Sequence, residues 1–253
     1  MTAVLRFLGS TLLAAVLVVV LWTAFLLAFP QIGPRVGKTP LDVWTYLSVA
    51  ENRGPVLSGL GTTLADAATG FAAGMCAALA AAALSLLWRG FAHTAVPVAT
   101  LLRSIPLVTM TPLVVLVVGR GTAAVAVMGG LVVFFPAFVV VTAALRDAPA
   151  QALDLVRAYG GGRGTALRRV ALPWAVPALF AAARISVPGA LVGALIAEWL
   201  GTGKGLGSAM IRAIPLYDYD RLWASIVAVT AASILVYALV GALERLVADR
   251  LGQ

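Results

Sequence analysis

The sequence predicts an all-α membrane protein with about six transmembrane helices. Of its 253 residues, 62% are hydrophobic and only 11% are charged, which is more apolar surface than a soluble globule of this size could bury. Uncharged runs cover 7–34, 67–88, 104–119, 121–145 and 222–243. Several of them reach the roughly 20 residues that a helix needs to cross a bilayer. Barrel-like alternation is absent, so helices are the expected spans.

The first predicted span, 10–29, follows Arg6 and resembles a secretory signal. Its apolar core is longer than the roughly 7–15 residues of a signal peptide, and no small-x-small cleavage site precedes Pro30. We therefore expect it to be retained as a helix. The segment 30–56 that follows is polar, with a short amphipathic piece at 41–49.

Apolar length and helix breakers predict the other spans at 57–88, 96–118, 122–146, 174–199 and 221–246. Pro106 and Pro112 predict a kink in the third of them. The interval 119–121 is too short for anything but a tight turn. Two glycine pairs spaced four apart, Gly70 with Gly74 and Gly189 with Gly193, favour close packing of helices within the chain.

Lysine and arginine near the span ends predict the orientation. With the N-terminus inside, the cytoplasmic side carries ten of them: Arg6, Arg89, Arg103, Arg146, Arg157, Arg163, Arg168, Arg169, Arg245 and Arg250. The outer side carries seven: Arg35, Lys38, Arg53, Arg120, Lys204, Arg212 and Arg221. Five of the ten lie in the single loop 146–172, and this concentration decides the orientation. Both termini are then cytoplasmic.

The loop 150–172 is too polar to cross lipid. Leu153, Val156 and Tyr159 recur at helical spacing and predict one apolar helix face. Three glycines at 160–162 end that helix. Residues 165–170 predict a second helix, and Pro173 then opens the fifth span. A helix, a glycine turn and a helix outside the membrane form a compact knob, which suits docking on a soluble partner.

The spacing of Asp154, Gly160, Leu172 and Pro173 resembles the cytoplasmic loop of ABC importer permeases, whose pattern is E-A-A-x3-G-x9-I-x-L-P. Aspartate stands where the family has glutamate. The resemblance implies the type I importer-permease fold in a single domain, 1–253, with its core at about 55–247 and a coupling loop at about 147–172. It also implies that this loop contacts a separate ATPase through Asp154, Tyr159, Gly160, Gly161, Arg163, Leu172 and Pro173.

Two further segments resemble the nitrate/sulfonate/taurine branch of these permeases. They are Leu102–Pro106 with Met110–Leu113, and Ala197–Leu200 with Gly203–Gly207. The resemblance implies a pair of permease subunits, two ATPase subunits that bind ATP and Mg²⁺, and an extracytoplasmic solute-binding protein. The chain itself would hold no cofactor and would lie in the bacterial inner membrane.

Three charged residues are candidates for the translocation path: Asp66, Arg184 and Glu198. A charge inside a span is costly and faces the bundle interior or water. Two alternatives stay open. Arg184 either lines the path or makes a structural ion pair, and Asp66 is either a path residue or an interfacial carboxylate.

Other functions fit the residues less well. The basic residues flank apolar spans and form no stripe with aromatic residues, which disfavours nucleic acid. The segment around Gly203 and Lys204 lacks the first glycine and the hydroxyl residue of a phosphate loop. One histidine and one cysteine make no metal cluster.

Two other classes of membrane protein are alternatives. A secondary transporter would need ionisable residues or broken helices at mid-membrane in both halves, and an enzyme would need a nucleophile with a base. The favoured function is therefore the transmembrane subunit of an ABC importer.

Overall fold

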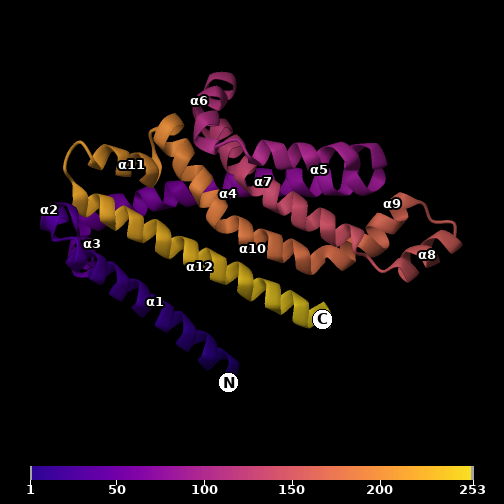
Figure 1. Ribbon diagram of the computed structural model, residues 1–253, viewed down its shortest axis with the longest axis horizontal. Coiled ribbons are helices and arrows are strands. Elements are labelled where there is room, and N and C mark those ends of the chain that lie inside the picture. Colours follow the sequence, from indigo (N-terminus) through magenta and orange to yellow (C-terminus); the bar gives the residue numbers. More distant parts are fainter. Residues whose placement is uncertain (1, 252–253) are drawn as a thin grey trace. The chain divides into compact units, whose positions relative to one another are not determined.

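The computed structural model describes residues 2–251, and within this range every regular element is a helix (Figure 1). The helices are α1 (Thr2–Ala28), η1 (Pro30–Ile32), α2 (Gly33–Val36), α3 (Pro40–Ser48), α4 (Ala50–Leu87), α5 (Arg89–Arg103), α6 (Leu107–Val118), α7 (Thr122–Arg146), α8 (Ala150–Ala158), α9 (Arg163–Ala166), η2 (Leu167–Ala171), α10 (Leu172–Ala197), η3 (Glu198–Thr202), α11 (Gly205–Ala213) and α12 (Tyr219–Leu251). The all-α fold class is confirmed.

Four helical stretches of the described chain are long and apolar enough to cross a membrane. They are Ala50–Leu87, Thr122–Arg146, Arg163–Thr202 and Tyr219–Val247. A fifth candidate is the pair Val16–Ala28 and Pro30–Ser48, which meet at a 77° bend. The expected fourth span, 122–146, coincides with α7.

The expected third span, 96–118, is two shorter helices instead of one kinked helix. α5 ends at Arg103 and α6 begins at Leu107. Pro106 has no N–H to continue the hydrogen-bond ladder, and it disfavours helical geometry at Ile105. Pro112 lies inside α6 and does not end it. The helix is therefore interrupted before Pro106, whereas Pro112 is accommodated within α6.

The fifth span is longer than expected, because helix continues without a break from Arg163 to Thr202. The expected start at Pro173 agrees with the start of α10 at Leu172, but further helical turns precede it. Residues Leu167–Ala171 form a π turn, in which the N–H of Leu172 bonds to the carbonyl of Leu167. Pro173 occupies the next position, near the start of α10, where a proline is tolerated.

The chain divides into two compact units. One unit comprises the residues from Gly59 to Ser208 together with those from Val229 on. Its centre is the contact of α7 with α10, and α4 packs beside them through glycine. A Cβ atom on Gly70 or on Gly193 would lie 2.7 Å from the Cα of Gly129. The helices touch backbone to backbone, so these glycines pack within the chain as the spacing predicted.

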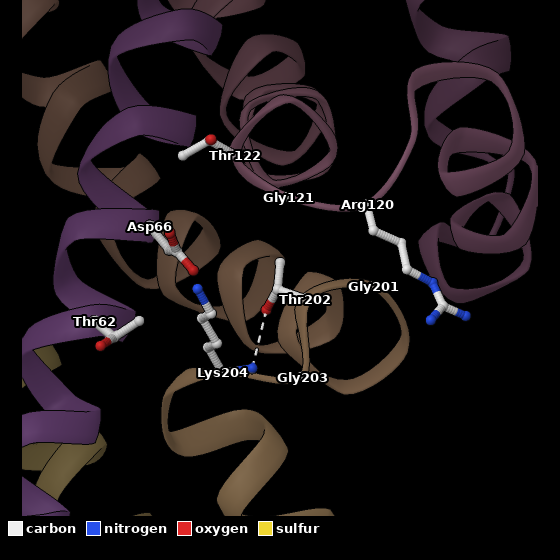
Figure 2. A pocket seen from close by; sticks show the side chains of 9 residues that line it. All are labelled: Thr62, Asp66, Arg120, Gly121, Thr122, Gly201, Thr202, Gly203 and Lys204. Carbon is white, nitrogen blue, oxygen red and sulfur yellow. Dashed lines mark hydrogen bonds between the residues drawn. The ribbon is translucent and has the colours of Figure 1, made fainter.

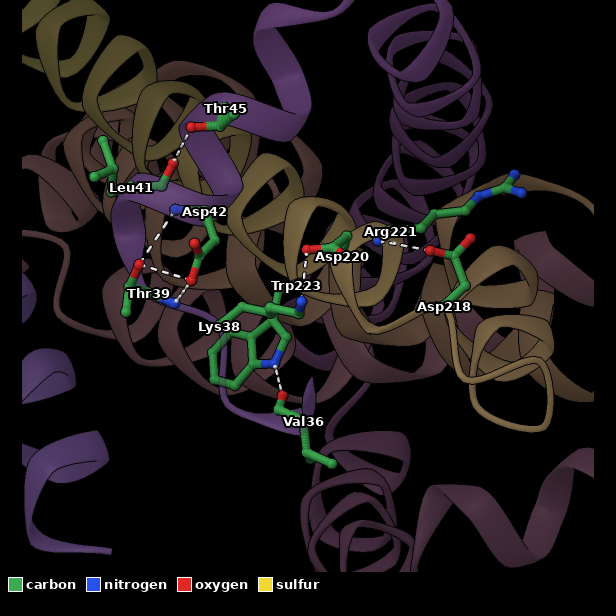
Figure 3. Close-up of polar contacts among 10 residues, drawn as sticks. All are labelled: Val36, Lys38, Thr39, Leu41, Asp42, Thr45, Asp218, Asp220, Arg221 and Trp223. Carbon is green, nitrogen blue, oxygen red and sulfur yellow. Dashed lines mark hydrogen bonds and ion pairs between the residues drawn. The ribbon is translucent and has the colours of Figure 1, made fainter. Parts of the chain in front are cut away.

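The other unit comprises residues up to Ser58 together with Ala209–Ala228. Polar contacts join the segment after α1 to the start of α12 (Figure 3). The indole of Trp223 donates to the carbonyl of Val36 at 2.8 Å, and Lys38 lies 3.1 Å from the carboxylate of Asp220. Thr39 and Asp42 form a capping box that starts α3.

Candidate functional site

The predicted turn of the 147–172 loop is a glycine helix cap. α8 ends at Ala158, and Gly160 has a φ of 76°. The N–H of Gly160 bonds to the carbonyl of Arg157 at 2.9 Å, and the N–H of Gly161 bonds to that of Val156 at 2.8 Å. These two bonds and the left-handed glycine form a Schellman motif, which satisfies the last carbonyls of the helix.

The constraint on the side chain differs at each of the three consecutive glycines. Gly160 is surrounded by open space, but its positive φ disfavours any side chain. Gly161 has an ordinary φ, yet a Cβ there would lie 2.8 Å from the carbonyl oxygen of Val156. Gly162 is extended, and a Cβ there would meet no atom within 4 Å. Two of the three positions therefore require glycine, whereas the family pattern requires one.

The apolar face predicted for α8 is divided in the structure, because Leu153 and Val156 are half-buried whereas Tyr159 is exposed. Leu153 contacts the core cluster that contains Leu145, Ala148 and Leu167. The surface left free carries Leu155, whose side chain is 59% exposed, and Tyr159, which is 85% exposed. These two residues are four apart and share one side of the helix. The exposed apolar surface of α8 is therefore the Leu155–Tyr159 side.

The charged residues of the loop make local contacts. Asp154 accepts a hydrogen bond from Arg157 at 2.8 Å, and both side chains are exposed, so the pair contributes little to stability. Arg163 donates to the carbonyl of Leu87 at 3.1 Å. That carbonyl is at the C-terminus of α4, where a cation is favoured. In Figure 1, α8 lies beyond the end of α10 and is joined to it through α9.

The last two predicted loop residues belong to a membrane helix. Leu172 packs against the same core cluster as Leu153, and Pro173 follows it in α10. The structure thus places Tyr159 and Asp154 at the surface, the glycines at the turn, and Leu172 at the base. Helical structure therefore connects the exposed turn to the α7–α10 core.

A polar pocket lies elsewhere in the same unit, between α4, the start of α7 and the turn after α10 (Figure 2). It has a volume of about 490 Å³, within the range of small-molecule sites. Its lining is Thr62, Asp66, Arg120, Gly121, Thr122, Gly201, Thr202, Gly203 and Lys204. The ammonium group of Lys204 points toward the Asp66 carboxylate, whereas Arg120 points away. Sequence reasoning identified Asp66 alone, since no local pattern relates it to Lys204.

Glu198 lies outside this pocket and is fully buried, with 0% exposure. Its Oε2 accepts hydrogen bonds from the N–H of Gly207 at 2.7 Å and from the hydroxyl of Thr63 at 3.1 Å. The same hydroxyl accepts from the N–H of Leu206 at 2.9 Å. These contacts join α4 to the segment after α10.

Arg184 contacts α12. Its Nη1 lies 3.0 Å from Oε2 of Glu244, and its guanidinium carbon lies 5.4 Å from the centre of the Tyr237 ring. An ion pair and an aromatic face together supply the partners that a cation in an apolar helix requires. This arrangement corresponds to the structural alternative for Arg184.

Comparison with known proteins gives the family. Residues 73–253 match the family described as the inner membrane component of binding-protein-dependent transport systems. A probable ABC transporter permease of Haemophilus influenzae is 31% identical over 175 residues, which cover 69% of this chain and 71% of that protein.

Two other relatives are named for different solutes. The riboflavin transport permease RibX of Chloroflexus aurantiacus is 29% identical over 59% of this chain and 56% of its own length. The putative aliphatic sulfonate permease SsuC of Bacillus subtilis is 26% identical over 59% of this chain and 54% of its own length. The chain thus spans little more than half the length of these two.

The fold agrees with the sequence comparison. The MetNI methionine ABC transporter, solved in inward-facing conformations, has a chain that superposes with a TM-score of 0.60 at 20% identity. The match covers 83% of this chain and 99% of that one. With the helical fold, the exposed turn and the matched residues 73–253 together, the chain belongs to the family of inner membrane components of binding-protein-dependent transport systems, as the transmembrane permease subunit of an ABC importer.

Proposed function

We propose that the 147–172 loop docks on a separate ATP-binding subunit and transmits that subunit's closure to the membrane helices. The supporting observation is the construction of the loop. Leu155 and Tyr159 are exposed on α8, while Leu153 and Leu167 fix its base to the core. A displacement of the exposed side would therefore move α7 and α10 as packed elements, because close-packed cores transmit strain.

We propose that the acidic residue of the loop, Asp154, meets the ATPase as part of an ion pair with Arg157. Asp154 is shorter than the family's glutamate by one methylene, and its carboxylate is held by Arg157. The ATPase would meet the pair together with the Tyr159 ring. Gly160 and Gly161 would set the angle of α8, and Arg163 would hold the loop to the end of α4.

The assembly that we infer contains two permease subunits, two ATPase subunits and an extracytoplasmic solute-binding protein. The second permease is another copy of this chain or a paralogue. ATP and Mg²⁺ would bind to the ATPase subunits, since the Lys204 segment does not satisfy the phosphate-loop pattern. The permease itself would perform no covalent chemistry. It would be a multi-pass protein of the bacterial plasma membrane with both termini in the cytoplasm.

The polar pocket is our candidate for a position on the solute path. Asp66 and Lys204 offer opposite charges, and Thr62, Thr122 and Thr202 offer hydroxyl groups. The solute class that we propose is small and delivered by the binding protein: nitrate, sulfonate, taurine, bicarbonate or a small heterocycle. The riboflavin and sulfonate relatives support this range without choosing within it. We assign Arg184 to helix packing, because its guanidinium group already contacts the carboxylate of Glu244 and the ring of Tyr237.

ATP hydrolysis by the reconstituted importer tests the docking surface. Leu155→Ala with Tyr159→Ala removes the exposed apolar side of α8 and leaves Leu153 in the core. We expect the stimulation of ATPase activity by the loaded binding protein to fall at least tenfold, with normal membrane insertion. Unchanged stimulation would remove this surface from the coupling mechanism.

Leu216→Ala is the matched control. Leu216 is 74% exposed, and the predicted topology assigns it to the outer side of the membrane. Its truncation removes a comparable exposed apolar side chain and should leave the stimulation unchanged. An equal loss in this control would indicate a general effect of apolar truncation and would contradict a specific role for α8.

A further inference from the structure

The segment after α10 wraps around the buried carboxylate of Glu198. Gly205 has a φ of 76°, and a methyl group there would overlap the carboxylate. A methyl group at Gly207 would lie 2.9 Å from Oε2. Backbone approaches the carboxylate from two sides, and only glycine permits that approach. The hydroxyl of Ser208 donates to the backbone carbonyl of Glu198 and closes the turn.

This turn is connected to α4 through Thr63. The Thr63 hydroxyl lies 3.1 Å from Oε2 of Glu198 and 3.1 Å from the carbonyl of Gly59, and its single proton serves one acceptor at a time. The Leu206 N–H donates to the hydroxyl oxygen in either case. All of these groups are shielded from water, so each lost hydrogen bond would leave a buried polar group without a partner.

Both ends of this connection adjoin the polar pocket. On α4, Thr62 precedes Thr63 and Asp66 follows one turn later, and both line the pocket. On the other side, Gly201–Lys204 lies between Glu198 and the N–H of Gly207. The Glu198 network therefore connects two walls of the pocket, the α4 wall with Asp66 and the turn with Lys204.

We propose that Glu198 is a positioning residue of the polar pocket, which acts as a buried hydrogen-bond acceptor that holds the Lys204 turn against α4. It does not itself line the solute path. A site of this kind requires a supporting shell to hold its walls in place. What the role demands is an acceptor oxygen at Oε2, which glutamine also provides, whereas leucine does not. The relevance to import rests on the proposed function, but the positioning does not.

Electron paramagnetic resonance measures the position directly. In a Cys76→Ser background, spin labels at Ala65→Cys on α4 and Lys204→Cys on the turn report the distance between the walls. We expect Glu198→Gln to keep the width of the wild-type distance distribution, and Glu198→Leu to broaden it at least twofold. An unbroadened distribution in Glu198→Leu would overturn the proposal. Equal broadening in Gln and Leu would overturn the acceptor role.

Two further variants guard against a general loss of structure. Ser186→Ala removes a buried hydroxyl on α10 that has no hydrogen-bond partner, and it should leave the distribution unchanged. Thr63→Val removes the acceptor for the Leu206 N–H and should broaden the distribution as Glu198→Leu does. A narrow distribution in Thr63→Val would contradict the proposed connection, even if Glu198→Leu fails to fold.

A chemical probe gives a second readout that needs no solute. In the Cys76→Ser background, the rate at which the small cationic reagent MTSET modifies Lys204→Cys depends on how the turn is held. We expect this rate to change at least threefold in Glu198→Leu and to stay within twofold in Glu198→Gln. These results are independent of ATPase coupling, so a failed docking experiment and a failed positioning experiment remain distinguishable.

Discussion

Charged residues in the apolar helices of this chain contact partners that are distant in sequence. Glu198 and Thr63 are 135 positions apart and meet in a buried hydrogen bond. Arg184 meets Glu244 across two packed helices. A charge or a polar group in apolar surroundings is costly unless a partner satisfies it. The sequence alone left open whether Arg184 lines the path or makes an ion pair, because the residue that would pair with it is distant in sequence.

The ion pair of Arg184 with Glu244 predicts how the melting temperatures of two single variants and the double variant compare. Arg184→Gln and Glu244→Gln each leave one charge without its partner, and each should lower the melting temperature of the purified chain by about 3 °C, the shift that ~1 kcal/mol produces at this size. The double variant should recover most of the loss, because neither charge remains. Thermal unfolding in detergent measures the set. Additive losses in the double variant would contradict the pairing.

At the level of elements, sequence patterns predicted the existence of helices better than the residues at which they begin and end. The helix before Gly160 and the turn itself were predicted because positive φ favours glycine, and the structure has both. The sequence predicted the start of α10 near Pro173, but not the π turn that joins α10 to the helix before it. It also predicted a kink at Pro106, where the structure has a break between α5 and α6. A proline in the sequence does not show whether the helix ends there or continues with one backbone hydrogen bond fewer.

The three glycines of the turn predict a graded mutational response. Gly160→Ala forces a side chain into a left-handed conformation, and Gly161→Ala places a methyl group against Val156. Both should reduce coupled ATPase activity at least threefold. Gly162→Ala meets open space in extended backbone and should behave as wild type. The assay is binding-protein-stimulated ATP hydrolysis at matched expression. A loss in Gly162→Ala equal to the others would contradict the Schellman geometry.

For the whole molecule, composition already determined that the chain is a helical membrane protein, because 62% hydrophobic content leaves no soluble alternative. Orientation depends on a weaker signal, ten basic residues against seven. The polar pocket could not be predicted at this scale. Its lining joins α4, the turn before α7 and the turn after α10, and only the packed fold brings these segments together.

Thiol labelling tests the orientation. In a Cys76→Ser background, Gly162→Cys should react with an impermeant reagent only from the cytoplasmic side, and Gly54→Cys only from the outside. Both positions have open space for a side chain. Labelling of intact cells against inside-out vesicles measures the difference. The reverse pattern would overturn both the orientation and the coupling role of the loop.

The most direct test of the coupling claim is a photocrosslink from Tyr159 in the assembled importer. A benzophenone amino acid at this position replaces the aromatic ring of the loop, which is 85% exposed. We expect a covalent adduct with the ATPase subunit, formed in the membrane and identified by mass. The same probe at Leu216 should give no such adduct. If Tyr159 yields no ATPase adduct in an active complex, or if Leu216 yields an equal one, the loop is not the docking site.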